Sequence, residues 1–68
     1  MKPLKITTPY ITLQQLLKIE DIISSGGEAK FYLAENPVLV NGESENRRGR
    51  KLYPSDVIKV DDQEFIIE

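Results

Sequence analysis

Residues 38–42 read Val-Leu-Val-Asn-Gly, and residues 53–58 read Tyr-Pro-Ser-Asp-Val-Ile. The first stretch is a short apolar strand that ends in the dipeptide most typical of a two-residue hairpin, because Asn41 and Gly42 both accept a positive φ at low cost. The second is a turn with proline at its second position, and it leads into another apolar strand. Strands joined to turns of this kind predict an antiparallel sheet in this half of the chain.

The residues that follow predict a second hairpin. Residues 57–60 have the composition of a strand, residues 61–63 are the polar run Asp-Asp-Gln, and residues 64–67 have the composition of a further strand. The last two strands are therefore expected to pair with each other.

Two helices are predicted before the first hairpin, and each begins with a capping motif. Thr12 and Gln15 have the spacing of a capping box, in which the Thr12 hydroxyl accepts from the amide of Gln15 and the Gln15 side chain accepts from the amide of Thr12. Ser25 and Glu28 repeat this spacing. Both helices are thus expected to start from the same arrangement, the second with Ser25 as its N-cap.

The order of the elements predicts the fold class. The first helix should end near residue 20 and the second at Asn36, because Pro37 cannot continue a helix. An alternating segment at residues 4–7 predicts an edge strand before the helices. A strand, two helices and three or four strands indicate an α+β fold, with both helices packed on a small, mostly antiparallel sheet. One domain over residues 1–68 is expected.

The composition excludes several classes of function. The chain of 68 residues has no cysteine and no histidine, so it lacks thiol chemistry, the commonest metal ligand and the usual neutral-pH general base. Neighbouring carboxylates at residues 20–21 and 61–62 are read as turn and surface residues. No enzyme activity, cofactor or metal is expected. Without an apolar run of about 20 residues, no membrane contact is expected either, and the cytoplasm is the predicted location.

Charge is distributed unevenly along the chain. Arg47, Arg48, Arg50 and Lys51 place four of the nine cations within residues 46–55, which contain no acidic residue. The other 58 residues carry five cations and eleven acids, a balance of −6, so the net charge of −2 hides a polarised molecule. Arginine forks can grip phosphates bidentately and stack on unpaired bases. The cluster therefore indicates contact with a polyanion, an ordinary solvated face being the alternative.

Over residues 12–60 the chain resembles the S4 RNA-binding domain family. The resemblance rests on three motifs in the family's order: a serine-led helix start at residues 25–30, Val-Leu-Val-Asn-Gly at residues 38–42, and Pro-Ser-Asp-Val-Ile at residues 54–58. These are similar to the family's V-x-V-N-G and P-G-D-x-I patterns. The stand-alone size looks like the small bacterial YaaA-type branch. The resemblance implies an S4-like (alpha-L) fold with two helices on a small curved sheet.

The resemblance also implies a function. It implies a non-catalytic module that binds structured RNA, with ribosomal RNA or a ribosome-assembly intermediate as ligand and transfer RNA as the next choice. A monomer is expected, and an unidentified ribosomal or replication-associated protein partner stays open. Gly26 departs from the family's usual arginine, and Ser55 replaces the glycine of P-G-D. A protein-interaction adaptor that uses the acidic surface is the alternative function.

The candidate RNA-binding residues lie on both helices and in residues 47–51, which we call the basic segment. Free amides at the start of the second helix, with the bare backbone of Gly26 and Gly27, suit a phosphate, plain helix capping being the alternative. Lys30, one turn further, matches a basic position of the S4 pattern, and Lys18 near the end of the first helix is a further candidate. The full set is Lys18, Ser25, Gly26, Gly27, Lys30, Arg47, Arg48, Arg50 and Lys51.

The aromatic residues are predicted to have structural roles. Phe31 lies off the apolar stripe of the second helix and is expected to pack against the rim of the sheet, with base stacking as the alternative. Tyr10, Tyr32 and Tyr53 are interpreted as core or rim residues whose hydroxyls reach water. No aromatic residue is therefore included in the predicted RNA-binding set.

Overall fold

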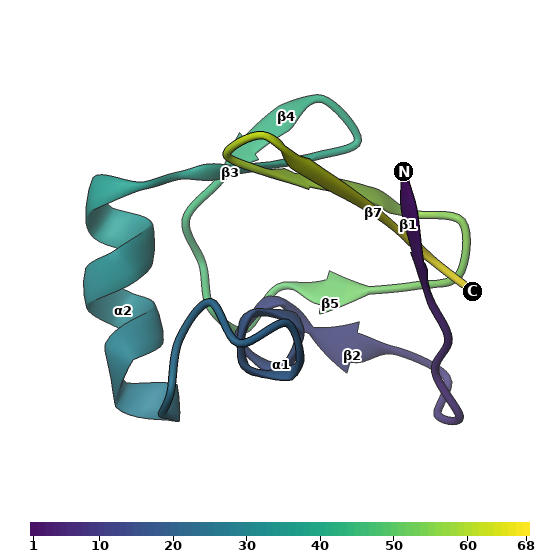
Figure 1. The fold of residues 1–68 in the computed structure, drawn as a ribbon, viewed down its shortest axis with the longest axis horizontal. Coiled ribbons are helices and arrows are strands. Elements are labelled where there is room, and N and C mark those ends of the chain that lie inside the picture. The colour runs from purple at the N-terminus through teal and green to yellow at the C-terminus, as the bar shows by residue number, and fades with distance from the viewer.

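The computed structural model describes all of residues 1–68 and contains two helices and seven strands (Figure 1). Neither helix is long and apolar enough to cross a membrane. The helices are α1 (Leu13–Ile19) and α2 (Gly26–Glu35). The strands are β1 (Lys2–Leu4), β2 (Ile11–Thr12), β3 (Val38–Val40), β4 (Glu43–Glu45), β5 (Lys51–Leu52), β6 (Val57–Val60) and β7 (Gln63–Ile67).

Five strands form one sheet in the order β1-β7-β6-β3-β4, and β2 pairs with β5 in a separate two-stranded sheet. The β1–β7 pair is parallel, and every other pair is antiparallel. Figure 1 shows the larger sheet as one layer, with α1 and the β2–β5 pair forming a second layer and α2 standing at one end of both. The predicted fold class is confirmed.

The core fills the space between these layers. Phe65 of β7 is fully buried, and α1 turns Leu13, Leu16 and Leu17 inward, each without exposed surface. A domain of this size buries only about 60% of the surface of its unfolded chain, so each of these side chains matters to stability. The 14 core residues are Ile11, Leu13, Leu16, Leu17, Ile23, Ala29, Leu33, Val38, Val40, Leu52, Ile58, Val60, Phe65 and Ile67.

Helix α1 begins with the capping box that the sequence predicts. The Thr12 hydroxyl accepts from the Gln15 amide at 3.2 Å, and the Gln15 side-chain oxygen accepts from the Thr12 amide at 2.7 Å. The capping box thus gives hydrogen-bond acceptors to two of the four amides that a helix start leaves without an internal partner, and it fixes where α1 begins.

The capping box predicted for Ser25 and Glu28 is wrong by one residue. Ser25 is the N-cap residue of α2, but its side chain makes no capping hydrogen bond. The Glu28 carboxylate instead accepts from the Ser24 amide at 3.3 Å and from the Ser24 hydroxyl. Adjacent serines offer the carboxylate two similar partners, so the spacing alone does not show which of them it binds.

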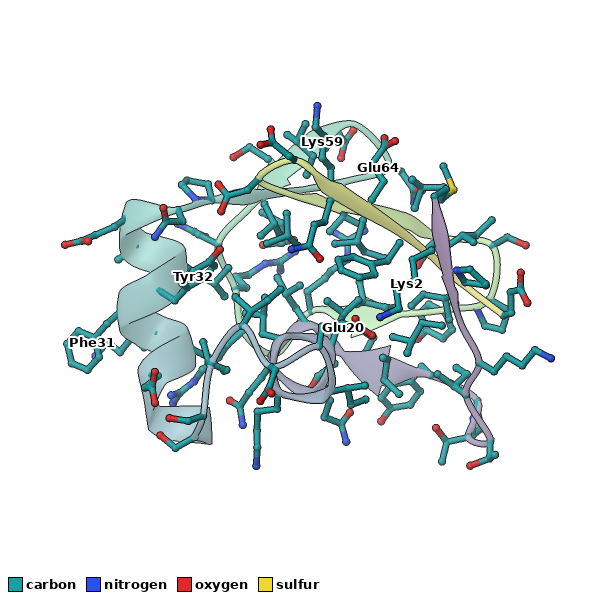
Figure 2. The ribbon with its side chains drawn as sticks, in the orientation of Figure 1. Lys2, Glu20, Phe31, Tyr32, Lys59 and Glu64 are labelled. Carbon is teal, nitrogen blue, oxygen red and sulfur yellow. The ribbon has the colours of Figure 1, made fainter.

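The first strand also differs from the prediction. It spans Lys2–Leu4 rather than residues 4–7, so Pro3 lies inside it. Because β1 is the outer strand of the sheet, proline is tolerated there without losing a ladder hydrogen bond to a second neighbour. Lys2 also reaches Glu20 after the end of α1, with 2.7 Å between Nζ and Oε1, and Figure 2 shows the two side chains pointing toward each other.

The Asn41 side chain links the Asn41–Gly42 turn to the turn at residues 53–56 and the strand that follows it. It has φ 52° and is followed by Gly42 at φ 85°, as the predicted hairpin requires. Its side-chain oxygen accepts from the Val57 amide at 2.9 Å, and its side-chain nitrogen donates to Asp56 at 3.0 Å. Ser55, at φ 82°, takes the left-handed place that glycine holds in the P-G-D pattern.

Replacing Asn41 by alanine should lower the free energy of unfolding by about 1–3 kcal/mol, because two hydrogen bonds worth about 0.5–1.5 kcal/mol each are lost. Urea unfolding followed by circular dichroism measures the change. Glu43→Ala is the matched control, since Glu43 is exposed and its side chain makes no hydrogen bond or ion pair. Equal loss in both variants would contradict a linking role for Asn41.

Candidate nucleic-acid interface

The basic segment is held against the start of α1. Between β4 and β5, the carbonyl of Arg48 accepts from the Gln14 amide and the carbonyl of Arg50 accepts from the Leu13 amide, both at 2.9 Å. These two amides belong to the first turn of α1 and have no partner within the helix. Residues 46–50 therefore close the N-terminus of α1 with their own backbone, and Figure 1 shows this segment running from the larger sheet to the layer of α1.

A buried carboxylate organises two of the arginines. Glu45, the last residue of β4, is only 6% exposed. Its carboxylate accepts from Arg47 Nε at 2.9 Å, Arg47 Nη2 at 3.0 Å, Arg50 Nη1 at 2.8 Å and the Arg47 amide at 3.0 Å. Both guanidinium groups thus have fixed positions before any ligand arrives. We call Glu45, Arg47 and Arg50 the arginine clamp.

The arginine clamp lowers the pKa of the Glu45 carboxyl far below its ordinary value of 4.5. The hydrogen bond from the Arg47 side chain is the largest cause, and those from Arg50 and the Arg47 amide add to it, whereas burial opposes them. A pKa that is lower in the folded chain stabilises folding above the ordinary value. That stabilisation declines as pH falls below the ordinary value and is gone once pH has fallen through the lowered pKa, whereas the carboxylate itself stays ionised in mild acid.

Arg48 and Lys51 keep their charges free of acidic partners. Neither forms an ion pair or a side-chain hydrogen bond, and both are exposed. The Lys51 ammonium lies 4.9 Å from the centre of the Tyr10 ring, within the range of a cation–π contact. The four predicted cations therefore divide into two that Glu45 holds in position and two that have no acidic partner.

The start of α2 meets the basic segment at Gln14. A Cβ added to Gly26 would lie 2.6 Å from Gln14 Nε2, so the end of the Gln14 side chain would have to move to accommodate it. The backbone of the same Gln14 donates to Arg48. Gly26 thus packs closely against α1, whereas a Cβ added to Gly27 would have no neighbour within 4 Å. Ser25 and Gly27 are exposed beside it.

The two predicted lysines lie further away. Lys18 is in the last turn of α1, about 6 Å along the helix axis from Gln14 at 1.5 Å per residue. Lys30 lies one turn into α2 and is exposed. Neither forms a hydrogen bond or an ion pair with the basic segment. The structure therefore brings together the start of α2 and residues 46–51, and it adds no contact for Lys18 or Lys30.

Phe31 does not pack against the sheet as expected. It is 74% exposed, and Figure 2 shows it pointing away from the rest of the molecule. The inward face of α2 is made by Ala29 and Leu33, with Tyr32 partly buried beside them. Phe31 projects from a different side of α2 than Ala29 and Leu33, so the prediction of rim packing is wrong.

An aromatic pair beside the arginines was missing from the predicted site. Tyr10 and Tyr53 have ring centres 5.7 Å apart with 49° between the ring planes, and they are 37% and 47% exposed. They are 43 positions apart in sequence and meet because β2 pairs with β5. Strands of two residues carry no detectable alternation, so no periodic signal could have predicted this contact.

Comparison with known proteins agrees with this architecture. The chain matches the model of the S4 domain over residues 4–68. It is 56% identical over 59 residues to a protein of Bacillus subtilis (strain 168) named probable ribosome maturation protein RlbA, and the aligned part covers 87% of this chain and 83% of that protein. No solved structure matches the chain. The family match extends beyond the motif-bearing residues, from Leu4 at the end of β1 to the end of β7, and it shows that this chain belongs to the S4 domain family.

Proposed function

We propose that this protein is a non-catalytic RNA-binding module with a role in ribosome maturation. Membership of the S4 domain family and the similarity to a protein named for ribosome maturation support an RNA-binding, ribosome-related role. Ribosomal RNA within an assembling ribosome is the proposed ligand, bound by a monomer in the cytoplasm. The absence of histidine and cysteine from the sequence supports action by binding alone.

The single observation that carries the proposal is that Gln14 of α1 lies against both the start of α2 and the basic segment. The start of α2 approaches the Gln14 side chain, and the Arg48 carbonyl accepts from the Gln14 amide. Amides at a helix start and arginine side chains are both typical phosphate contacts in nucleic-acid complexes. An RNA backbone that crosses this region can meet both at once.

The test is the salt dependence of binding to ribosomal RNA fragments. Binding that neutralises about four phosphates should give a slope of log K against log [salt] of roughly −3 to −4. Replacing both free cations, Arg48→Ala with Lys51→Ala, should weaken binding and flatten the slope by about two units, one for each lost phosphate contact. Fluorescence anisotropy with labelled RNA over a series of salt concentrations measures both quantities.

The matched control removes the same charge elsewhere. Lys5→Ala with Lys59→Ala also takes away two exposed cations, and Lys59 points away from α1 (Figure 2). Equal effects of the two double variants would overturn the proposed surface, because net charge alone would then explain binding. Replacing Arg47 and Arg50 is less informative, since Glu45 would stay buried without its partners.

A further inference from the structure

The tyrosine pair lies at the edge of the proposed RNA surface. Ile11 pairs with Leu52 in the antiparallel β2–β5 ladder, so Tyr10 and Tyr53, the next residues outward, fall opposite each other. Cross-strand aromatic pairs of this kind pack closely, and here the ring centres are 5.7 Å apart. The pairing fixes the orientation of Tyr53 from one side and leaves nearly half of its surface exposed.

A hollow of about 490 Å³ opens next to Tyr53. Its volume falls within the range of pockets that hold small ligands, which is about 300–1,000 Å³. Three of its five lining residues are cations, and the only aromatic one is Tyr53. The lining residues are Arg47, Gly49, Arg50, Lys51 and Tyr53.

The two tyrosines differ in what their rings can contact. The Lys51 ammonium covers the Tyr10 ring at 4.9 Å, so Tyr10 already has a partner. Tyr53 has no cation over its ring and borders the hollow. An aromatic face beside guanidinium groups matches a nucleotide, whose base stacks on the ring while its phosphate meets the cations.

We infer that the hollow at Tyr53 is a subsite for one unpaired nucleotide of the RNA. The inference rests on the proposed RNA-binding function and specifies it further. Tyr53 stacks on the base, and Tyr10 packs against Tyr53. Arg47 and Arg50 of the arginine clamp, together with Lys51, contact the flanking phosphates. A base inside a helix is stacked on both faces and cannot reach Tyr53, so the subsite favours a bulge or a loop over an uninterrupted stem.

Three synthetic RNAs test the subsite. The first is a stem with a bulge of unpaired adenosines, the second has the same bulge without its bases, and the third is the uninterrupted stem. The wild-type protein should bind the first about 5- to 150-fold more tightly than the other two, which is the range for stacking one base on an aromatic side chain. Stacking should also quench tyrosine fluorescence, since the chain has three tyrosines and no tryptophan.

Variants assign the effect to Tyr53. Tyr53→Leu keeps apolar cover over the β2–β5 pair but should abolish the preference for the bulge with bases, whereas Tyr53→Phe should retain it. Phe31→Leu alters another exposed aromatic residue and should also retain the preference. Circular dichroism confirms that each variant is folded.

The outcomes separate the subsite from the wider proposal. If all three RNAs bind wild-type protein equally, or if Tyr53→Leu keeps the preference, the subsite is refuted. The proposed function still stands in that case, provided that the Arg48 and Lys51 substitutions weaken binding. If no RNA binds at low salt, the subsite and the proposed function both fail.

Discussion

Replacing Glu45 by glutamine is expected to weaken RNA binding, even though it removes a negative charge from a basic surface. The carboxylate accepts four hydrogen bonds that fix Arg47 and Arg50. Glutamine offers one oxygen and turns an NH2 group toward the remaining guanidinium donors, so the arginine clamp should open. Both arginines must then be ordered by the RNA itself, at the expense of affinity.

The magnitudes decide the direction of the effect. Ordering one long side chain on binding weakens affinity by about two- to tenfold, so two arginines account for about 4- to 100-fold. Removing one negative charge several ångströms from the phosphates strengthens binding by no more than about threefold, because water and salt screen the repulsion. The loss of preorganisation should therefore exceed the electrostatic gain.

Glu43→Gln is the matched control for this prediction. Glu43 lies two residues earlier in β4, is exposed, and makes no side-chain hydrogen bond or ion pair. Removing its charge should leave affinity unchanged or raise it slightly. Anisotropy measurements on both variants with one RNA are sufficient. Tighter binding by Glu45→Gln would show that the clamp quenches arginine charge rather than positioning it.

Phe65→Ala should remove a large share of the free energy of unfolding. Phe65 is the largest of the fully buried side chains and lies in the inner face of β7. Truncating a buried phenylalanine costs about 3–5 kcal/mol. Total stability is about 0.05–0.15 kcal/mol per residue, or about 3–10 kcal/mol for a chain of this length, so the substitution removes a large share of it.

The same substitution on the surface provides the control. Phe31→Ala removes an identical ring from the outer face of α2, where 74% of the residue is exposed. It should change the free energy of unfolding by no more than about 0.5 kcal/mol. Urea unfolding followed by circular dichroism compares the two. A small effect of Phe65→Ala would mean that the core can collapse around the missing ring.

Features specified by neighbouring residues could be predicted from the sequence. The Asn41–Gly42 turn needs only two residues that accept a positive φ, and the α1 cap needs only Thr12 and Gln15 at the right spacing. One local prediction, the capping box at Ser25, was wrong by one residue, whereas the position of the first strand depended on distant contacts. Pro3 is tolerated inside β1 because of the strand's place in the sheet.

The predicted site was incomplete for the same reason. A cluster of cations is visible in the sequence, but the sequence does not show that Glu45 holds two of them. An acidic residue that precedes arginines looks like an unfavourable neighbour for RNA until its burial is known. The meeting of Tyr10 and Tyr53 likewise depends on pairing between two-residue strands far apart in the chain.

The way residues 46–50 close the start of α1 limits how this region can vary in evolution. Two consecutive amides of α1 donate to carbonyls that are two positions apart in the segment. One inserted or deleted residue would put at least one carbonyl out of register and would also displace β5 from β2. Relatives should therefore differ here by exchange of side chains at constant length. Changes of length are better tolerated at the exposed turn formed by residues 61–62.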